Sequence, residues 1–268
     1  MLPRVIHYCW FGGNPKNEMI EKCIASWRKY CPDYQIIEWN ENNYDVNAHP
    51  FMKKAYEAKK WAFVSDYARI DILFRHGGIY LDTDVELIRG LDDFLDCDFF
   101  AGFESPAIVA FGLGFGAAAG HPVLRDIMDT YDELEFPDDT LELPKISCPI
   151  IQTNALKKRG LQLNGRSQTV EGCHIYSAEY FCPMSCETGK IDITDKTVSI
   201  HHYDMSWLAE PYRRAKQQKW RLMQRFGEKR GSVIASVISF PAKISARIRD
   251  GSFKNYIRFM LRSGKKDG

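Results

Sequence analysis

The opening of the chain alternates between strand-like and helix-like hydrophobic patterns. Residues 4–10 are rich in β-branched and aromatic side chains and end at a pair of glycines, which predicts a strand that breaks into a loop. Apolar residues then recur at helical spacing from Met19 to Trp27, and a second strand is expected around 34–39. This order of strand, helix and strand favours a sheet that is covered by helices.

A long helical pattern follows between residues 50 and 76. It should form two helices that meet near Trp61, and Gly77-Gly78 can adopt the left-handed backbone that ends a helix. A short strand at 79–81 comes directly afterwards. We therefore expect an α/β fold with a mixed sheet whose ligand-binding residues lie at the carboxyl ends of strands.

The pattern is weaker in the second half of the chain. A stretch rich in glycine, alanine and phenylalanine at 98–120 predicts closely packed strands. The other expected elements are a helix over 122–131, a loop over 132–143, a helix over 150–158, short strands near 173–181, and a strand over 197–202.

The formal net charge of +1 conceals an uneven distribution of charge. Residues 212–268 hold 16 Lys and Arg against three acids, which leaves 20 basic and 32 acidic residues in 1–211. We therefore divide the chain into an acidic body, 1–211, and a basic tail, 212–268. Such a tail suits a polyanion, either a nucleic acid or an anionic membrane surface.

The tail combines cations with branched aliphatic residues. Residues 232–249 predict two amphipathic helical pieces on either side of Pro241, and 256–262 predict another. This composition is typical of helices that lie in an anionic membrane interface. The alternative is a helical pair that packs on the body or on a second copy of the chain. Binding to nucleic acid is disfavoured by the acidic body.

No uninterrupted apolar stretch is long enough to span a bilayer, and the first residues lead directly into the first expected strand. We therefore expect a cytoplasmic protein that associates peripherally with the inner face of the membrane. The eight cysteines are scattered without zinc-site spacing, so we interpret them as reduced thiols.

Asp82 and Asp84 are the first candidate for chemistry. Two aspartates at positions i and i+2 after a buried strand point to the same side, so they can hold a divalent cation. Mg²⁺ and Mn²⁺ prefer oxygen ligands and commonly bind one or two carboxylates together with substrate phosphates. A cation there could neutralise the diphosphate that leaves a nucleotide sugar. The alternative is a solvated acidic turn.

Asp66 and Arg69 are the second candidate. They lie three residues apart on the preceding expected helix, and therefore on one face of it. A carboxylate and a guanidinium together match the hydroxyl and phosphate groups of a sugar phosphate. The alternative is an ordinary ion pair along a helix.

Five further polar residues are candidates for roles in the site. His201 and His202 follow each other on the last expected strand, so only one should face the metal, and we favour His201. Either could instead be structural. Glu104, Gln152 and Asn154 are candidates for contacts with an acceptor, with ordinary surface polarity as the alternative.

One long combination of motifs resembles a known family. Ser65-Asp66-Tyr67-Ala68-Arg69, followed by Gly77-Gly78-Ile79-Tyr80-Leu81-Asp82-Thr83-Asp84, is similar to the sugar-binding region of glycosyltransferase family 32. This family includes yeast initiating mannosyltransferases and bacterial capsule and lipopolysaccharide transferases, and the large clostridial glucosylating toxins are related. The opening at 6–13 and the closing His201-His202-x₃-Ser206-Trp207 extend the resemblance over most of 1–207.

The resemblance implies a GT-A type fold and roles for individual residues. Trp10 would stack on the nucleotide base, where an indole suits uracil, so UDP is preferred and GDP stays open. Tyr80 would line the site beside the diphosphate. Asp84 would bind the metal, whereas Asp82 would have a mixed role toward the metal and the sugar.

The same resemblance implies that Ser206 and Trp207 close over the diphosphate. The toxins carry a glutamate before this serine that is absent here, which leaves the third metal ligand open between His201 and His202.

The resemblance also implies transfer of a hexose with retention of configuration. No carboxylate stands out as a covalent nucleophile, so we expect a front-face displacement assisted by the leaving diphosphate. The expected acceptor is a glycan or lipid-linked glycan of surface polysaccharide or lipopolysaccharide synthesis. The alternatives are a protein acceptor, as for the toxins, or a nucleic-acid-binding protein that uses its tail. Oligomerisation is open.

Overall fold

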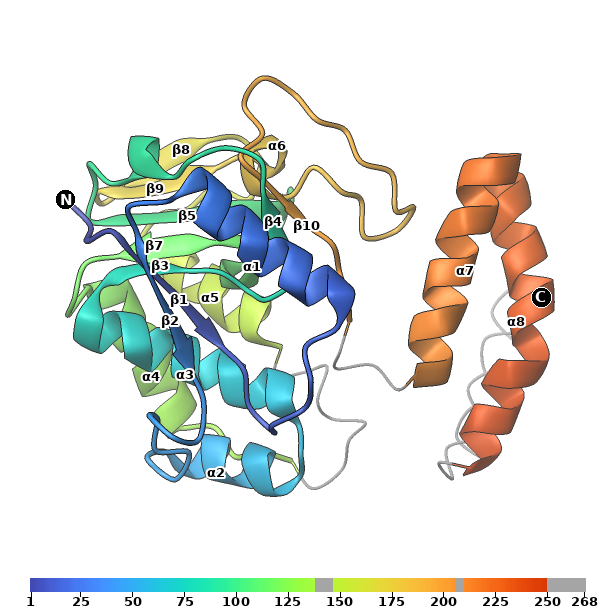
Figure 1. The fold of residues 1–268 in the computed structure, drawn as a ribbon, viewed down its shortest axis with the longest axis horizontal. Helices are drawn as coiled ribbons and strands as arrows, with labels where there is room; N and C mark the ends of the chain where they lie inside the picture. The colour runs from blue at the N-terminus through green and yellow to red at the C-terminus, as the bar shows by residue number, and fades with distance from the viewer. Residues whose placement is uncertain (138–146, 206–209, 250–268) are drawn as a thin grey trace. The chain divides into compact units, whose positions relative to one another are not determined.

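The computed structural model describes residues 1–137, 147–205 and 210–249, with side chains up to 238 (Figure 1). The chain divides into two compact units. One consists of 1–184 with 192–203, and the other consists of 185–191 with the part that follows Tyr203. The 211/212 division expected from the charge distribution falls inside a helix of the second unit.

The first unit contains a mixed sheet flanked by helices. Its strands are β1 (Val5–Cys9), β2 (Gln35–Trp39), β3 (Gly78–Tyr80), β4 (Val85–Leu87), β5 (Phe99–Ser105), β6 (Ile108–Val109), β7 (Phe115–Ala117), β8 (Gln168–Val170), β9 (Cys173–Tyr176) and β10 (Ser199–His201). Its helices are α1 (Glu18–Tyr30), α2 (Pro50–Glu57), α3 (Trp61–His76), η1 (Asp92–Phe94), η2 (Phe111–Leu113), α4 (Pro122–Asp132), α5 (Cys148–Lys158) and α6 (Ala178–Phe181).

The strands form one large sheet and one small ribbon. The large sheet has the order β2-β1-β3-β7-β5-β9-β8, with β6 beside β5, and β4 pairs separately with β10. Strand β1 runs parallel to β2 and β3, whereas β7 runs antiparallel to β3 and β5. The mixed α/β sheet flanked by helices that the GT-A expectation described is therefore confirmed.

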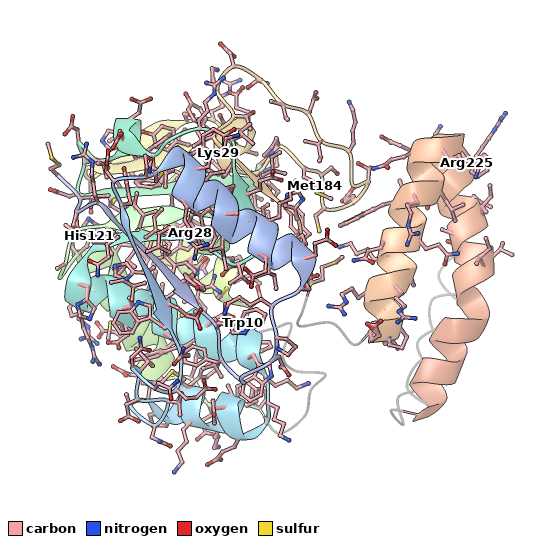
Figure 2. All side chains as sticks on the ribbon, in the orientation of Figure 1. Trp10, Arg28, Lys29, His121, Met184 and Arg225 are labelled. Carbon is pink, nitrogen blue, oxygen red and sulfur yellow. The ribbon has the colours of Figure 1, made fainter. Side chains whose placement is uncertain are left out.

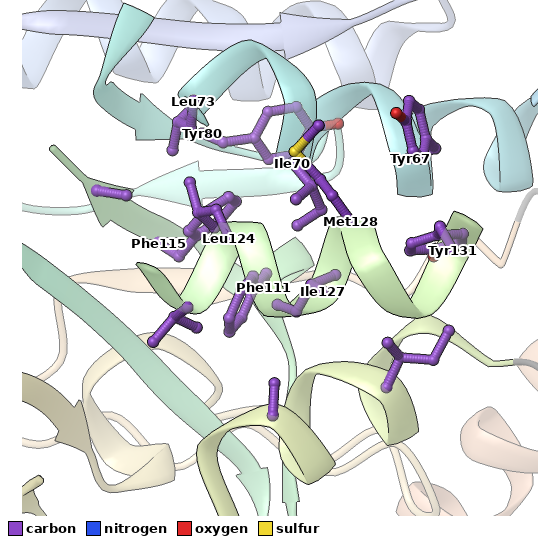
Figure 3. Close-up of a cluster of buried hydrophobic side chains, with 14 of the residues drawn as sticks. Tyr67, Ile70, Leu73, Tyr80, Phe111, Phe115, Leu124, Ile127, Met128 and Tyr131 are labelled. Atoms are coloured by element: carbon purple, nitrogen blue, oxygen red, sulfur yellow. The ribbon is translucent and has the colours of Figure 1, made fainter. Parts of the chain in front are cut away.

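Strand alternation divides the side chains between two apolar layers. On β5, Phe99 and Phe103 join the core that includes residues of α3, α4 and α5. Figure 3 shows this layer, with α4 side chains packed against residues of α3 and the sheet. Phe100 points the other way and stacks on Phe181 of α6, with ring centroids 5.8 Å apart. On that face Tyr8 of β1 meets Trp27 of α1 edge to face.

Two glycines join α3 to β3 in the way the sequence predicts. Gly77 ends α3 with a φ of 63°, and Gly78 has a φ of 112°. A Cβ atom on Gly78 would lie 2.9 Å from both the carbonyl oxygen of Val5 and Nε2 of His7. Only glycine satisfies both the backbone angle and the close approach to β1. The expected break between α2 and α3 near Trp61 is also confirmed.

This topology brings several chain segments to one edge of the sheet. His7 of β1 lies beside Tyr80 of the parallel β3, so Trp10 and Asp82 both follow the carboxyl ends of neighbouring strands. Strand β4 then pairs with β10, with Val85 opposite His201. Trp27 of α1 holds β4 in place by donating a hydrogen bond from Nε1 to the Val85 carbonyl at 2.7 Å.

Some expectations for the second half of the chain require correction. The strand expected to continue to 181 ends at Tyr176, and the short helix α6 follows. Part of the expected loop at 132–143 lies outside the described residues. None of the eight cysteines, all of which lie in described segments, forms a disulfide.

The described part of the second unit contains two helices, α7 (Glu210–Phe226) and α8 (Glu228–Arg249). Helix α8 continues through Pro241, so the expectation of two separate pieces there is wrong. A proline costs a helix interior one backbone hydrogen bond but does not have to end it. The helix expected at 256–262 lies outside the described residues. Among the helices that are described, none combines the length and hydropathy needed to cross a membrane.

His7 is a buried histidine that helps to join β1 to its neighbours. Its Nδ1 accepts a hydrogen bond from Nε1 of Trp39 at 3.0 Å, and Nε2 lies 3.0 Å from the Gly77 carbonyl. An Nε2–H tautomer satisfies both contacts. Burial lowers the pKa of His7 from 6.5 to about 4, with a smaller opposing effect of the bond to Gly77. His7 is therefore neutral in the folded protein.

We predict that His7 makes the protein less stable in mild acid. Between pH 6.5 and pH 4 the unfolded chain binds a proton at His7 that the folded chain excludes, so stability falls as the pH falls, by about 3 kcal/mol at most. Urea unfolding across this range should show a steeper loss for the wild type than for His7→Gln. Equal slopes would contradict the assignment.

Candidate functional site

Asp82 lies two residues after the end of β3, and its carboxylate contacts Tyr80 and Arg69. The hydroxyl of Tyr80 donates to its Oδ1 at 3.1 Å. Nη2 of Arg69 lies 3.2 Å from Oδ1, and Nη1 lies 3.4 Å from Oδ2. Tyr80 and Asp82 share one side because they are two residues apart along an extended chain. The carboxylate is therefore fixed toward α3.

Arg69 is the centre of this arrangement. Its guanidinium also lies 2.9 Å from Oδ1 of Asp66 and 5.0 Å from the centre of the Tyr80 ring, and Nε donates to the Ser65 carbonyl at 3.1 Å. The Arg69 side chain is 5% exposed and that of Asp66 is 12% exposed. The expected pair of Asp66 and Arg69 is thus one half of a network that continues to Asp82.

Burial and charge act against each other in this network. Burial raises the pKa of Asp66, which the charge of Arg69 and a hydrogen bond from the Cys148 thiol only partly offset. Burial also raises the pKa of Asp82, with Arg69 opposing it and Asp84 adding to it. Burial alone would lower the pKa of Arg69. The negative charges of Asp82 and Asp66 outweigh this effect, so the pKa of Arg69 lies well above its usual value. The guanidinium is a permanent cation.

Asp84 and His201 form the second half of the site. Nε2 of His201 lies 3.2 Å from Oδ1 of Asp84. Burial lowers the pKa of His201, but the charge and hydrogen bond of Asp84, with smaller effects of Asp82 and Glu104, outweigh it and raise the pKa overall. The other ring nitrogen, Nδ1, is buried and has no hydrogen-bond partner within the part of the chain that the structure describes.

Asp82, Asp84 and His201 together have the composition of a divalent cation site. One ligand atom from each lies within 4.8 Å of the others, and all three residues are partly buried. Two carboxylates and an imidazole suit Mn²⁺, and the carboxylates also suit Mg²⁺. Arg69 and Tyr80 contact Asp82, whereas Asp84 lies beside His201.

His202 does not join this cluster. Its Nε2 lies 2.8 Å from Oε2 of Glu86, which also pairs with Lys22 of α1. Successive residues of an extended chain point to opposite sides, and it is Nε2 of His201 that lies 3.2 Å from Asp84. The inclusion of His202 among the metal ligands is therefore corrected.

Trp10 lies at the end of β1, where Figure 2 labels it. The indole is half-buried, Nε1 donates to the Asn14 carbonyl at 2.7 Å, and the Lys16 ammonium lies 5.4 Å from the ring centre. The ring is therefore held by one edge and retains an accessible part. Ser206 and Trp207, expected to close over the diphosphate, lie outside the described residues.

The three candidates for acceptor contacts lie in different environments. Glu104 is half-buried on β5 and close enough to His201 to affect its pKa. Gln152 is only 1% exposed, and its Oε1 accepts a hydrogen bond from the Phe111 amide at 2.9 Å, so it does not present itself to an acceptor. Asn154 is exposed and lines a surface cavity with Thr130 and Ile151.

Two residues of the site were missed by the sequence interpretation. Cys148 begins α5 and donates its thiol to Asp66, and Gly112 lies directly against the Asp82 carboxylate. The glycine-rich pattern at 111–116 indicated close backbone approach without naming the partner. No pattern in the sequence connects Cys148 to Asp66.

A family model supports the interpretation of this region. Residues 17–100 match the model described as "Glycosyltransferase sugar-binding region containing DXD motif". The chain carries this sugar-binding region. The resemblance to family 32 is thereby confirmed, and the DXD motif corresponds to Asp82-Thr83-Asp84.

Curated relatives match part of the chain. "Inositol phosphoceramide mannosyltransferase 3" of Schizosaccharomyces pombe is 29% identical over 143 residues, which are 50% of this chain and 38% of that protein. "Uncharacterized glycosyltransferase L373" of Acanthamoeba polyphaga mimivirus is 32% identical over 109 residues, or 37% of this chain and 42% of that protein. The matches thus span less than half the length of these relatives.

Two solved structures are also similar. "PaToxG Glycosyltransferase" has a TM-score of 0.48 and 16% identity, with 59% of this chain and 68% of that chain covered. A glycosyltransferase involved in the glycosylation of the major capsid of PBCV-1 has a TM-score of 0.43 and 12% identity, with 79% and 97% covered.

We predict that Arg69→Ala lowers the free energy of unfolding by about 3–5 kcal/mol, because Asp66 and Asp82 lose the cation between them while buried. Urea denaturation followed by circular dichroism at pH 7 measures this change. Arg125→Ala serves as the control, since Arg125 and Asp129 form an exposed pair whose loss should cost less than about 1 kcal/mol. Similar small losses in both variants would contradict the role of Arg69.

Proposed function

We propose that this protein is a metal-dependent glycosyltransferase that moves a hexose from a nucleotide sugar, preferably a UDP-sugar, to a glycan or lipid-linked glycan. One observation carries the proposal. The Asp82, Asp84 and His201 cluster is joined through the buried cation Arg69 to Asp66, and its two aspartates belong to the matched sugar-binding region. This places candidate groups for a metal, a diphosphate and a sugar side by side.

The residues at the cluster fit Mn²⁺ or Mg²⁺. Asp84 and His201 would hold the ion, with Asp82 direct or through water. When bound, the ion supplies a Lewis acid for the oxygens of the leaving diphosphate. The close approach of two carboxylates and the imidazole of His201, whose Nδ1 has no partner in the described segments, favours such a ligand.

Arg69 and Asp66 would act on the donor. A guanidinium that cannot lose its proton stabilises negative charge as the diphosphate departs, and it does so most strongly in a site from which water is excluded. Asp66 can accept hydrogen bonds from sugar hydroxyls while its other contacts, to Arg69 and Cys148, keep it in place. Trp10 would stack on the base, with uracil preferred.

We further propose that the reaction retains the configuration of the sugar. The acceptor hydroxyl would attack the anomeric carbon on the face from which the diphosphate leaves, and its proton would pass to a diphosphate oxygen. Asp66, the carboxylate expected nearest the sugar, is committed to Arg69 and is a poor covalent nucleophile. Proximity of the reactants, and not a covalent intermediate, would supply much of the rate.

The acceptor class is proposed from the relatives. One of them is named an inositol phosphoceramide mannosyltransferase, and this name gives a lipid acceptor and a mannosyl group. A lipid-linked glycan, of the kind used for a capsule or lipopolysaccharide, is consistent with such an acceptor. Transfer to a protein is the alternative, and product analysis with both acceptor types separates the two.

The second unit would bring the enzyme to an anionic membrane surface at the cytoplasmic face. Its described helices expose five cations, Arg214, Arg221, Arg225, Lys229 and Arg230. They also expose apolar side chains, since Val233 is 65% and Val237 is 70% exposed. Cations that flank an exposed apolar face match the headgroups and the acyl boundary of an anionic bilayer.

We predict that Asp84→Ala abolishes turnover of the nucleotide sugar, with a loss of at least about 100-fold, and that EDTA has the same effect on the wild type. Release of UDP or GDP from a panel of nucleotide sugars, with and without Mn²⁺, measures both. Asp129→Ala removes an exposed aspartate away from the site and should retain full activity. Full wild-type activity in EDTA would exclude the metal role.

We predict that replacing Val233 and Val237 together by Asp weakens binding to anionic lipid vesicles by about tenfold or more, because two exposed apolar contacts are lost and negative charge is added. Vesicle co-sedimentation at low and high salt measures the effect. Ile193→Asp changes an apolar residue of the first unit that is 56% exposed, and it is the control. Unchanged binding would favour a helical pair that packs on the body or on another copy.

A further inference from the structure

The short helix η2 contacts the Asp82 end of the site through Gly112. The Asp82 amide donates to the Gly112 carbonyl at 3.3 Å. A Cβ atom on Gly112 would lie 2.2 Å from Oδ2 of Asp82 and 3.1 Å from Nη1 of Arg69. Helix η2 also contacts β10, the strand that supplies His201. It therefore borders both halves of the candidate site.

Gly112 is required for space and not for backbone conformation. Its φ lies outside the left-handed region, in contrast to Gly114 with a φ of 125°. An alanine at 112 would meet no backbone strain, but its methyl group would overlap the carboxylate of Asp82. The carboxylate cannot move away from this methyl group without breaking its ion pair with Arg69 and its hydrogen bond from Tyr80.

The surrounding structure also prevents η2 from moving away from Asp82. Phe111 is fully buried and stacks on Phe115, with ring centroids 4.5 Å apart. Its amide donates to Oε1 of Gln152 at 2.9 Å. Gln152 is itself 1% exposed, so this hydrogen bond is buried, and its Nε2 has no hydrogen-bond partner among the described residues.

We infer that Gly112 is a positioning residue for Asp82, and that Gln152 holds Gly112 in place through the Phe111 amide. This inference rests on the proposed function, because Gly112 would orient Asp82 toward Arg69 and toward the ion that the cluster would hold. It also gives Gln152 a role different from contact with the acceptor. A side chain at position 112 is excluded because the site needs the volume for the carboxylate.

A double-mutant cycle tests this positioning role in the full chain. The variants are Gly112→Ala, Asp82→Ala and the two together, and the probe is Mn²⁺ with UDP, titrated by calorimetry. We expect Gly112→Ala to weaken Mn²⁺ affinity about tenfold or more, the range seen when a residue that orients a ligand is changed. In the Asp82→Ala background the overlap with the carboxylate is absent, and only Arg69 remains near the methyl group, with Nη1 at 3.1 Å. Because the guanidinium is then released from Asp82 and can move aside, we expect little further effect.

Thermal unfolding of the same four proteins provides a readout that does not depend on the metal. Gly112→Ala should lower the melting temperature in the wild-type background and leave it unchanged beside Asp82→Ala. If Gly112→Ala alone fails to fold, recovery of folding in the double variant gives the same support. Gly90→Ala, whose added Cβ would meet only the Tyr30 carbonyl at 3.1 Å, is the matched control.

Three results would separate the inference from the function on which it rests. Equal effects of the methyl group on the melting temperature in both backgrounds would overturn the positioning role. A wild-type level of Mn²⁺ affinity in Gly112→Ala would also overturn it. Absence of Mn²⁺ binding by the wild type, with the melting temperatures as expected, would overturn the proposed function and leave the steric role of Gly112 established.

Discussion

The candidate site depends on one buried guanidinium. Arg69 lies between Asp66 and Asp82 with its side chain almost fully enclosed, so each carboxylate requires the cation and the cation requires both. Two negative charges around one positive charge leave the cluster with excess negative charge, and Asp84 adds to it. This excess favours a divalent cation beside Asp82, which is the property that a diphosphate-binding site uses.

The network is formed by elements that lie far apart in the sequence and are brought together by the fold. Gly77 and Gly78 form the short turn between helix α3 and strand β3. This turn brings Arg69 of α3 into contact with Asp82, which follows β3. Strand β10 then returns from the end of the first unit to pair with β4 and places His201 beside Asp84. The motif supplies the carboxylates, and the late strand supplies the imidazole.

Local patterns predicted the parts of the molecule that depend on neighbours in the sequence. The strand at 4–10, the break between α2 and α3, and the facing of Asp82 and Asp84 all follow from periodicity and from glycine. The sequence favoured His201 over His202 without deciding between them, because alternation along a strand separates the two rings but does not say which of them lies beside Asp84. Likewise, the approach of Gly112 to Asp82 and of Cys148 to Asp66 is set by packing between distant segments, and periodicity contains no information on such contacts.

The central claim is that this buried network binds a nucleotide sugar with the help of a divalent cation. Its most direct measurement is calorimetric titration of UDP- and GDP-sugars into the full chain in Mn²⁺ and again in EDTA. Our account predicts saturable binding of at least one of these donors in Mn²⁺, reduced by about tenfold or more in EDTA. Binding of no donor under either condition, by a protein shown to be folded, would contradict it.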